Sequence, residues 1–174
     1  MAISFYDASV GSYLQTLDAA QGFLQKSLDW GSANGLGPEQ LVEARLCPDM
    51  HPLRFQVQQI VFHSAGSMEA IRNGVLAFAH DRPQHSYAEL QALVAKAASD
   101  LRALSADEVN SLEANEVAFR VPGKADRMFT AEGFLLTFSL PNFHFHATTA
   151  YAILRAKGAP VGKMDFMGAL RLKA

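Results

Sequence analysis

The chain has 174 residues and a mass of 18.9 kDa, and 49% of its residues are hydrophobic. A chain of this size and composition can bury one substantial core, so we expect a single domain over residues 1–174. The 15 lysines and arginines are scattered and are balanced by 17 acidic residues to a net charge of -2, which argues against nucleic acid as a partner.

The cysteine content and the N-terminal residues indicate where in the cell the protein is expected. Cys47 is the only cysteine, which excludes an intrachain disulfide and a multi-cysteine zinc site and favours a reducing compartment. The N-terminal residues lack the basic and apolar regions of a signal peptide, and no run of about 18 apolar residues occurs. We therefore expect a cytoplasmic protein with no membrane partner.

The first part of the chain has the hydrophobic period of helices. Apolar residues recur at helical spacing from Val10 to Trp30, which predicts a long first helix that ends at the following glycines. Pro38 can occupy the first position of a short helix that continues to Arg45.

Two further long helices are predicted in the middle of the chain. The second begins near Asp49, which is placed to cap it, and its apolar face extends to Ile71. Ser86 and Glu89 have the spacing of a capping box, and they predict the start of a third helix that continues to Leu104.

A change of period marks the region after the third helix. Apolar and polar residues alternate in 116–121, and a Pro-Gly turn separates this segment from 127–129, so we predict a small β-hairpin. Thr130 can cap a fourth long helix that ends at Gly158 and is kinked by Pro141. The sequence thus predicts an all-α four-helix bundle with a small β-hairpin between the third and fourth long helices.

Polar residues interrupt the apolar faces of the second and fourth helices. Asn142 and His146 are four residues apart and share a helix face, while His63 lies on a polar strip with Gln56 and Gln59. If the two helices are neighbours, His63, His146 and the Asn142 amide oxygen would form a weak site for zinc or nickel.

A second interpretation needs no metal. Asn142 and His146 would then be core polar residues that are hydrogen-bonded to each other, to Thr149, or to carbonyl groups released by Pro141. His144 points to another face of the same helix, which it shares with Tyr151.

The remaining histidines give weaker signals. His51 is close to Asp49 and would form an acid–base pair with it, unless Asp49 caps the second helix, which we favour. His80 and His85 fall in a polar interhelical segment and are expected to be solvated. Phosphate-binding and nucleophile-elbow motifs are absent, so nucleotide chemistry has no support.

Two segments carry a resemblance to a known family. They are LPNFHFHATTAYAILRAKGAPVGKMDF at 140–166 and CPDMHPLRFQVQ at 47–58. Both are similar to the bacterial domain-of-unknown-function family numbered nineteen ninety-three, within the DinB/YfiT-like superfamily. The resemblance implies a four-helix bundle that commonly forms homodimers. Many DinB-like proteins resemble metalloenzymes with one histidine from the second helix and an H-x3-H pair from the last, and some relatives use low-molecular-weight thiols.

The resemblance assigns site residues one by one. The second histidine of the family's pair matches His146, the first matches Asn142, and the second-helix histidine matches His63 or, with a one-residue slip, Phe62. An amide in place of an imidazole removes a strong nitrogen donor, so the resemblance implies a weak or absent metal.

Two functions follow from this resemblance. One is a thiol-transferase-like enzyme whose metal is held by His63, Asn142 and His146. The other is a non-catalytic homodimer that binds a small molecule or a protein partner in the same pocket. We assign to that pocket Gln56, Gln59, His51, Thr149 and Tyr151. In the enzyme, His144, Tyr151 or His51 would assist proton transfer.

Overall fold

The structure is a computed structural model that describes residues 3–78 and 83–173. Within these residues the helical elements are η1 (Asp7–Gly11, π-helical), α1 (Ser12–Ala33), α2 (Pro38–Val42), α3 (Leu53–Phe62), α4 (Ala65–Asn73), α5 (Tyr87–Arg102), α6 (Ala106–Asn110), α7 (Ala131–Phe134), η2 (Leu135–Ser139, π-helical), α8 (Leu140–Ala156) and α9 (Lys163–Met167). The strands are β1 (Val75–Ala77), β2 (Glu116–Arg120) and β3 (Arg127–Thr130).

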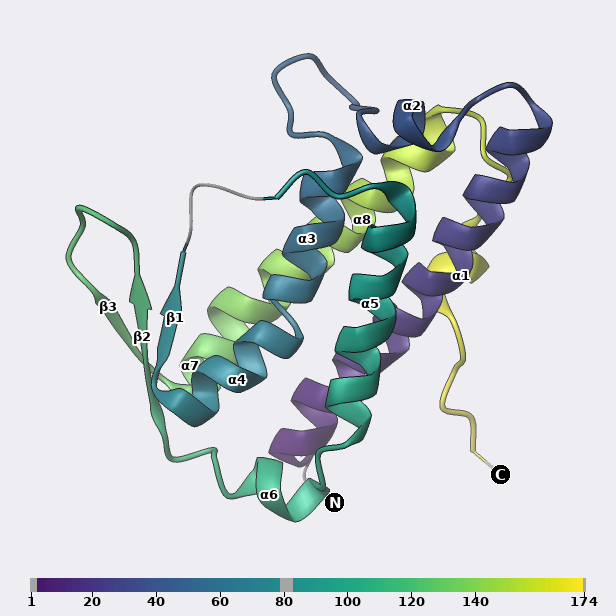
Figure 1. Cartoon of the computed structure of the whole chain (residues 1–174). Coiled ribbons are helices and arrows are strands. Elements are labelled where there is room, and N and C mark those ends of the chain that lie inside the picture. Colours follow the sequence, from purple (N-terminus) through teal and green to yellow (C-terminus); the bar gives the residue numbers. More distant parts are fainter. Residues whose placement is uncertain (1–2, 79–82, 174) are drawn as a thin grey trace.

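Four long helical segments form a bundle, as the sequence predicts (Figure 1). Helix α1 packs against α5 and α8, and α3 packs against the same two helices, which gives the order α1, α5, α3, α8 around the core. The second and fourth long helices of the sequence are therefore neighbours. The predicted all-α bundle with a small β element is confirmed.

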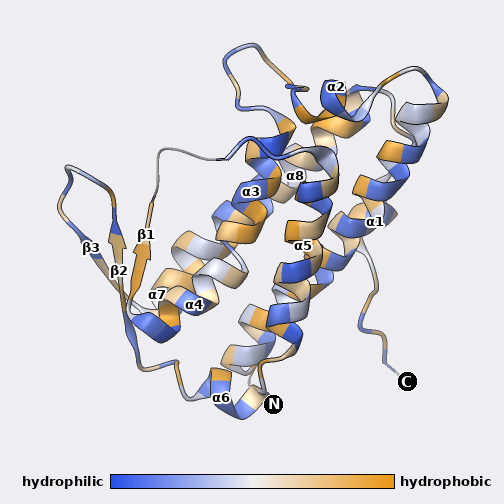
Figure 2. Cartoon of the chain, viewed as in Figure 1, coloured by the Kyte–Doolittle hydropathy of each residue, from blue (hydrophilic) through white to orange (hydrophobic). Residues whose placement is uncertain are grey.

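The core lies where the apolar faces of these helices meet. Hydrophobic and hydrophilic residues alternate along α1 and α5 at helical intervals (Figure 2). The largest fully buried side chains include Tyr13, Phe23, Tyr87, Phe134 and Phe143. Among the described residues, no helix is long and apolar enough to span a membrane.

Two of the predicted helix starts are confirmed by their capping bonds. The Ser86 hydroxyl accepts from the Glu89 amide at 3.3 Å, and the Glu89 carboxylate accepts from the Ser86 amide at 2.7 Å. The Thr130 hydroxyl accepts from the Gly133 amide at 3.0 Å. In each case a side chain satisfies a backbone donor that the first helical turn leaves without a partner.

The prediction for the second long helix was wrong in two respects. Helix α3 begins after Pro52, whose extended backbone (ψ 172°) forms the N-cap, so Asp49 lies in a preceding turn and does not cap it. The helix also does not continue unbroken to Ile71, because His63 and Ser64 leave the helical conformation and α4 starts a new helix. His63 therefore stands at the end of a helix instead of within one.

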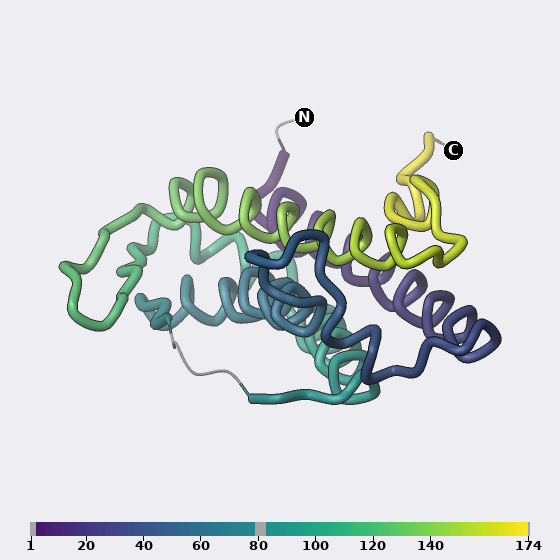
Figure 3. Tube along the Cα trace, turned by 90° about the horizontal axis from the view of Figure 1, so that it is seen from above, coloured from purple at the N-terminus to yellow at the C-terminus, as the bar shows by residue number. Residues whose placement is uncertain are grey.

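The β element is larger than the predicted hairpin. Strands β2 and β3 pair antiparallel with Val117 opposite Phe129, which confirms the hairpin, and it projects from one end of the molecule (Figure 3). Strand β1 adds a parallel edge with Leu76 opposite Phe119. Gly74, with φ +79°, ends α4 and allows the chain to turn into this strand.

The fourth long helix runs continuously through α7, η2 and α8. Pro141 lies in the first turn of α8, directly after the π-helical segment, and its missing N–H group is consistent with an irregularity at this point. Gly158, with φ +102°, follows the end of the helix as predicted. Phe166 of α9 then packs on Tyr151, with ring centroids 5.7 Å apart.

Candidate metal site between α3 and α8

Two helix irregularities face each other in the core. At the end of α3, the His63 carbonyl accepts a hydrogen bond from the Ser139 hydroxyl of η2 at 2.7 Å. Ser139 Oγ also lies 2.8 Å from Ser67 Oγ and within hydrogen-bond distance of the Tyr13 hydroxyl. Because the His63 carbonyl can only accept, Ser139 donates its one hydroxyl proton there, and its oxygen is able to accept from the Tyr13 hydroxyl.

This buried polar network fixes the position of His63. Tyr13, Ser67 and Ser139 are all fully buried. Burial raises the pKa of Tyr13 well above its ordinary value, so its hydroxyl remains a protonated donor. The network satisfies the backbone carbonyl that the end of α3 leaves available, and it joins the break between α3 and α4 to the last long helix.

We predict that Ser139→Ala lowers the free energy of unfolding by about 1–3 kcal/mol, because the His63 carbonyl would lose its buried side-chain donor and the Tyr13 hydroxyl would lose one of its partners. Chemical denaturation measures this change. Ser32→Ala is a matched control, since Ser32 bonds to the Leu28 carbonyl on an exposed surface and should change stability by less than about 0.5 kcal/mol. Equal effects of the two variants would contradict a structural role for the network.

His63 and His146 lie next to each other across the contact between α3 and α8. Their ring centroids are 5.8 Å apart and their planes differ by 9°. His63 is 4% exposed and His146 is 9% exposed. Because each coordinating nitrogen would lie about 2.0–2.1 Å from zinc, this ring separation is short enough for both imidazoles to reach one ion.

Gln56 determines which nitrogen of His146 carries the proton. The Gln56 side-chain nitrogen donates to the His51 carbonyl at 3.0 Å, so its oxygen is the atom that lies 2.8 Å from His146 Nδ1. An amide oxygen can only accept, and Nδ1 therefore donates. In the neutral imidazole the lone pair is then on Nε2, which is the arrangement that metal-bound histidines commonly have.

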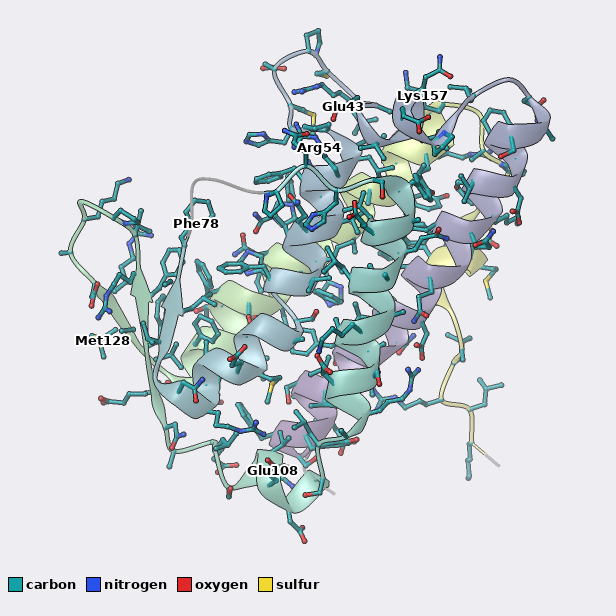
Figure 4. All side chains as sticks on the ribbon, in the orientation of Figure 1. Glu43, Arg54, Phe78, Glu108, Met128 and Lys157 are labelled. Carbon is teal, nitrogen blue, oxygen red and sulfur yellow. The ribbon has the colours of Figure 1, made fainter. Side chains whose placement is uncertain are left out.

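The aromatic residue Phe55 connects the histidine pair to the surface. The exposed His51 ring stacks on Phe55, with centroids 4.0 Å apart and planes differing by 22°. Phe55 in turn meets His146 edge to face at 6.0 Å. Nearby, Arg54 is held by Glu43 at 2.6 Å, which ties the start of α3 to the segment after α2 (Figure 4).

The structure also places the other residues that the sequence assigned to this site. The half-buried Asn142 donates from its amide nitrogen to the Phe138 carbonyl at 2.7 Å. Thr149 donates to the Phe145 carbonyl at 2.7 Å, and Gln59 is buried on α3. Asn142 thus bonds to a carbonyl of the preceding turn, which is the kind of pairing that the metal-free interpretation expects.

Tyr151 and His144 lie on other faces of α8. The Tyr151 ring contacts Phe23 of α1 at 6.2 Å, besides its contact with α9. His144 is on the outer surface, where partial burial lowers its pKa. The structure therefore groups Gln56, His63 and His146 and places Tyr151 and His144 elsewhere.

His80 and His85 were both expected to be solvated, and the structure describes only one of them. His80 lies outside the described residues. His85 is half-buried, and its Nδ1 lies 2.7 Å from the side-chain nitrogen of Gln58, so it has a protein partner and is not simply solvated.

The donor set fits a divalent ion only in part. Two adjacent imidazoles, one of them oriented by Gln56, are suitable ligands for zinc or nickel. Within residues 3–78 and 83–173, however, no group of three His, Cys, Asp or Glu residues is placed to hold an ion. Water or a small ligand would therefore have to complete the coordination shell.

Sequence reasoning missed the network behind His63. Ser67 and Ser139 are polar residues on core-facing positions, which is a signal that each needs a partner. The sequence offers no way to pair them, because Ser139 of η2 meets Ser67 of α4 and the His63 carbonyl only in the folded core.

Comparisons with known proteins agree with this architecture. The family model described as "Domain of unknown function (DUF1993)" matches residues 5–167. The structure is also similar to the crystal structure of a DinB family member protein from Shewanella denitrificans at 1.83 Å resolution, with a TM-score of 0.78 and 26% sequence identity. That similarity covers 97% of this chain and 94% of the other chain. No curated protein shows significant similarity to the chain.

Proposed function

Because this chain belongs to the DUF1993 family and has a DinB-like fold, we propose that it binds a divalent metal ion, zinc or nickel, through His63 and His146. The activity that we propose is that of a metal-dependent enzyme of the thiol-transferase type. Asn142 would be a weak additional ligand, because its amide nitrogen is already bonded to the Phe138 carbonyl. We expect the cytoplasm as its location, from the single cysteine.

The hydrogen bond between Gln56 and His146 is the observation that carries this proposal. It holds the proton on Nδ1 and so places the imidazole lone pair on Nε2, and the neighbouring imidazole is that of His63. When bound, the ion would supply Lewis acidity that lowers the pKa of a thiol or water. In the proposed enzyme, His51, at the exposed end of the aromatic contact, would assist proton transfer.

Metal analysis of the untagged protein tests the proposal. We expect about one zinc or nickel ion per chain after reconstitution, together with a rise in melting temperature as metal is added, because a ligand that binds only the folded state stabilises it. Magnesium, which prefers oxygen ligands, should give no such rise. The proposal would be contradicted if the protein takes up neither zinc nor nickel and its melting temperature does not change when they are added.

We predict that Gln56→Leu weakens zinc binding about 10–100-fold, because loss of the oxygen that accepts from Nδ1 removes the orientation of His146. Isothermal titration calorimetry measures the change. Gln21→Leu, on the surface of α1, is the control and should leave zinc affinity unchanged. An unchanged affinity in Gln56→Leu would show that this bond has no part in metal binding.

A second candidate function is a non-catalytic homodimer that binds a small molecule or a protein partner in the same pocket. The limited number of ionisable ligands among the described residues supports it, as does the local pairing of Asn142. Saturable binding of a small molecule by metal-free protein, unaffected by added zinc, would favour this candidate over the enzyme.

We also propose that the protein forms a homodimer through the outer surface of α8 and η2. Leu136 is 49% exposed and Phe145 is 59% exposed, and large apolar side chains in such positions are typical of interfaces. We predict that Phe145→Asp converts the dimer into a monomer, as measured by sedimentation velocity, whereas Met128→Asp on the hairpin leaves it intact. A monomeric wild-type protein would contradict the homodimer.

A further inference from the structure

A cleft lies on the opposite side of α3 from the contact with α8. It has a volume of about 620 Å³ and is bordered by α3 and α4 on one side and α5 on the other. Its apolar wall is formed by Phe62, Met68, Leu93, Ala97, Leu101 and Leu104. The volume is within the usual range of about 300–1,000 Å³ for small-molecule sites.

Gln58 supplies a polar group in the wall of this cleft. The residue is 6% exposed, and its side-chain nitrogen donates to the Pro83 carbonyl at 2.8 Å and approaches His85 Nδ1 at 2.7 Å. These two contacts fix the amide orientation, because the Pro83 carbonyl can only accept. Among the described residues, no donor reaches the buried Gln58 oxygen. An unmet buried acceptor is unfavourable, so a ligand that donates a hydrogen bond to it would be favoured.

Four charged residues among those described line the cleft, two acidic and two basic, and three of them are engaged in ion pairs. Lys96 is paired with Asp100 at 2.6 Å, and Arg72 is paired with Glu108 of α6 at 2.6 Å. Glu69, exposed on α4, also lines the cleft, and it makes no ion pair within the described part of the chain. One carboxylate at the mouth is thus not compensated by a protein cation.

We propose that this cleft binds a small molecule with an apolar body and a protonated amine. The apolar wall receives the body, and the two acceptors, Glu69 at the rim and Gln58 in the wall, both require donors. An ammonium group supplies donors and a positive charge, whereas a carboxylate supplies neither. The cleft differs from the histidine pair, which lies on the α8 side of α3, and the two are separated by Phe62, whose ring lines the cleft and meets His63 edge to face at 5.0 Å.

Three probes with the same naphthalene body separate the contributions of the positive charge and of the hydrogen-bond donors to binding. They are 1-naphthylmethylamine, 1-naphthylmethanol and 1-naphthoate, and their binding to the full-length protein is measured by ligand-observed and protein-observed NMR. We expect saturable binding of the amine with a dissociation constant of about 1 mM or tighter. The alcohol should bind about two- to fivefold more weakly, because it lacks the charge that Glu69 attracts, and the carboxylate should bind weakest.

Variants assign the binding to the cleft. Ala65→Phe and Leu93→Trp each place a bulky ring in it and should abolish binding of the amine, while Ala95→Phe, on an exposed position of α5 outside the cleft, should not. Two blocking variants on different helices guard against loss of folding in one of them, which circular dichroism detects.

Glu69→Gln tests whether the negative charge of Glu69 contributes to binding of the amine. This variant should weaken binding of the amine about two- to fivefold and leave binding of the alcohol unchanged. The control is Glu113→Gln, at an exposed position outside the cleft, and it should alter the affinity for neither compound. The proposal is overturned if the amine does not bind saturably, if both folded blocking variants still bind it, or if the carboxylate binds as well as the amine. Binding that is lost in His146→Ala would place the amine in the histidine site and would also overturn the proposal.

Discussion

His146→Ala is expected to abolish zinc and nickel binding. His146 supplies one of the two adjacent imidazoles, and its Nδ1 bond to Gln56 leaves Nε2 as the nitrogen with the lone pair. The variant would keep a single imidazole, that of His63, and one nitrogen donor would hold a divalent ion too weakly to survive dialysis. Elemental analysis and calorimetric titration measure the loss.

His144→Ala is the matched control for this variant. It removes an imidazole two residues away on the same helix, but from the exposed surface, and it should leave metal binding unchanged. His146→Gln, which retains a polar side chain beside Gln56, guards against a folding defect in the alanine variant. If folded His146→Ala binds zinc as tightly as the wild type, the ion is held elsewhere and the proposed site is wrong.

Phe143→Ala is expected to lower the free energy of unfolding by about 3–5 kcal/mol. Phe143 is completely buried and meets Tyr13 edge to face, with ring centroids 5.0 Å apart. Its removal would leave a cavity in the core where α1 and α8 meet, beside the network that contains Tyr13. Urea denaturation, with the midpoint and the slope fitted separately, measures the change.

Phe145→Ala is the comparison for Phe143→Ala. It deletes the same side chain two residues along α8, where the ring is 59% exposed, and should cost less than about 1 kcal/mol at protein concentrations low enough to avoid association. Similar losses in the two variants would mean that the face of α8 assigned to the core is wrong.

Local sequence signals were sufficient for most helices and for the hairpin. The capping box of Ser86 and Glu89 and the Thr130 cap depend only on residues within one turn, and both are present as predicted. Alternation in 116–121 likewise predicted β2, because a period of two is a property of the strand itself. The family resemblance pointed to the same bundle, and the DUF1993 match and the DinB family neighbour support it.

Features that depend on distant partners could not be predicted in this way. The break after α3 was missed because apolar spacing continues to Ile71, while the carbonyl freed at His63 is satisfied by Ser139, far along the chain. Strand β1 was missed because three apolar residues after Gly74 have no distinguishing period, and the strand exists by pairing with β2. The parallel partner comes from more than 40 residues away in the sequence.

The candidate site likewise combines features that follow from local sequence with features that depend on distant partners. By itself, the sequence determined that Gln56 faces inward on the second helix and that His146 lies on the core side of the fourth, because helical spacing sets the face of each residue, whereas His63 lies just beyond the end of its helix. Only the tertiary structure decided that the two helices are neighbours, that Gln56 bonds to His146 while Asn142 turns to the Phe138 carbonyl, and that Tyr151 faces α1. The physical reason is that a buried polar group must be paired, but its choice of partner depends on which helices pack together.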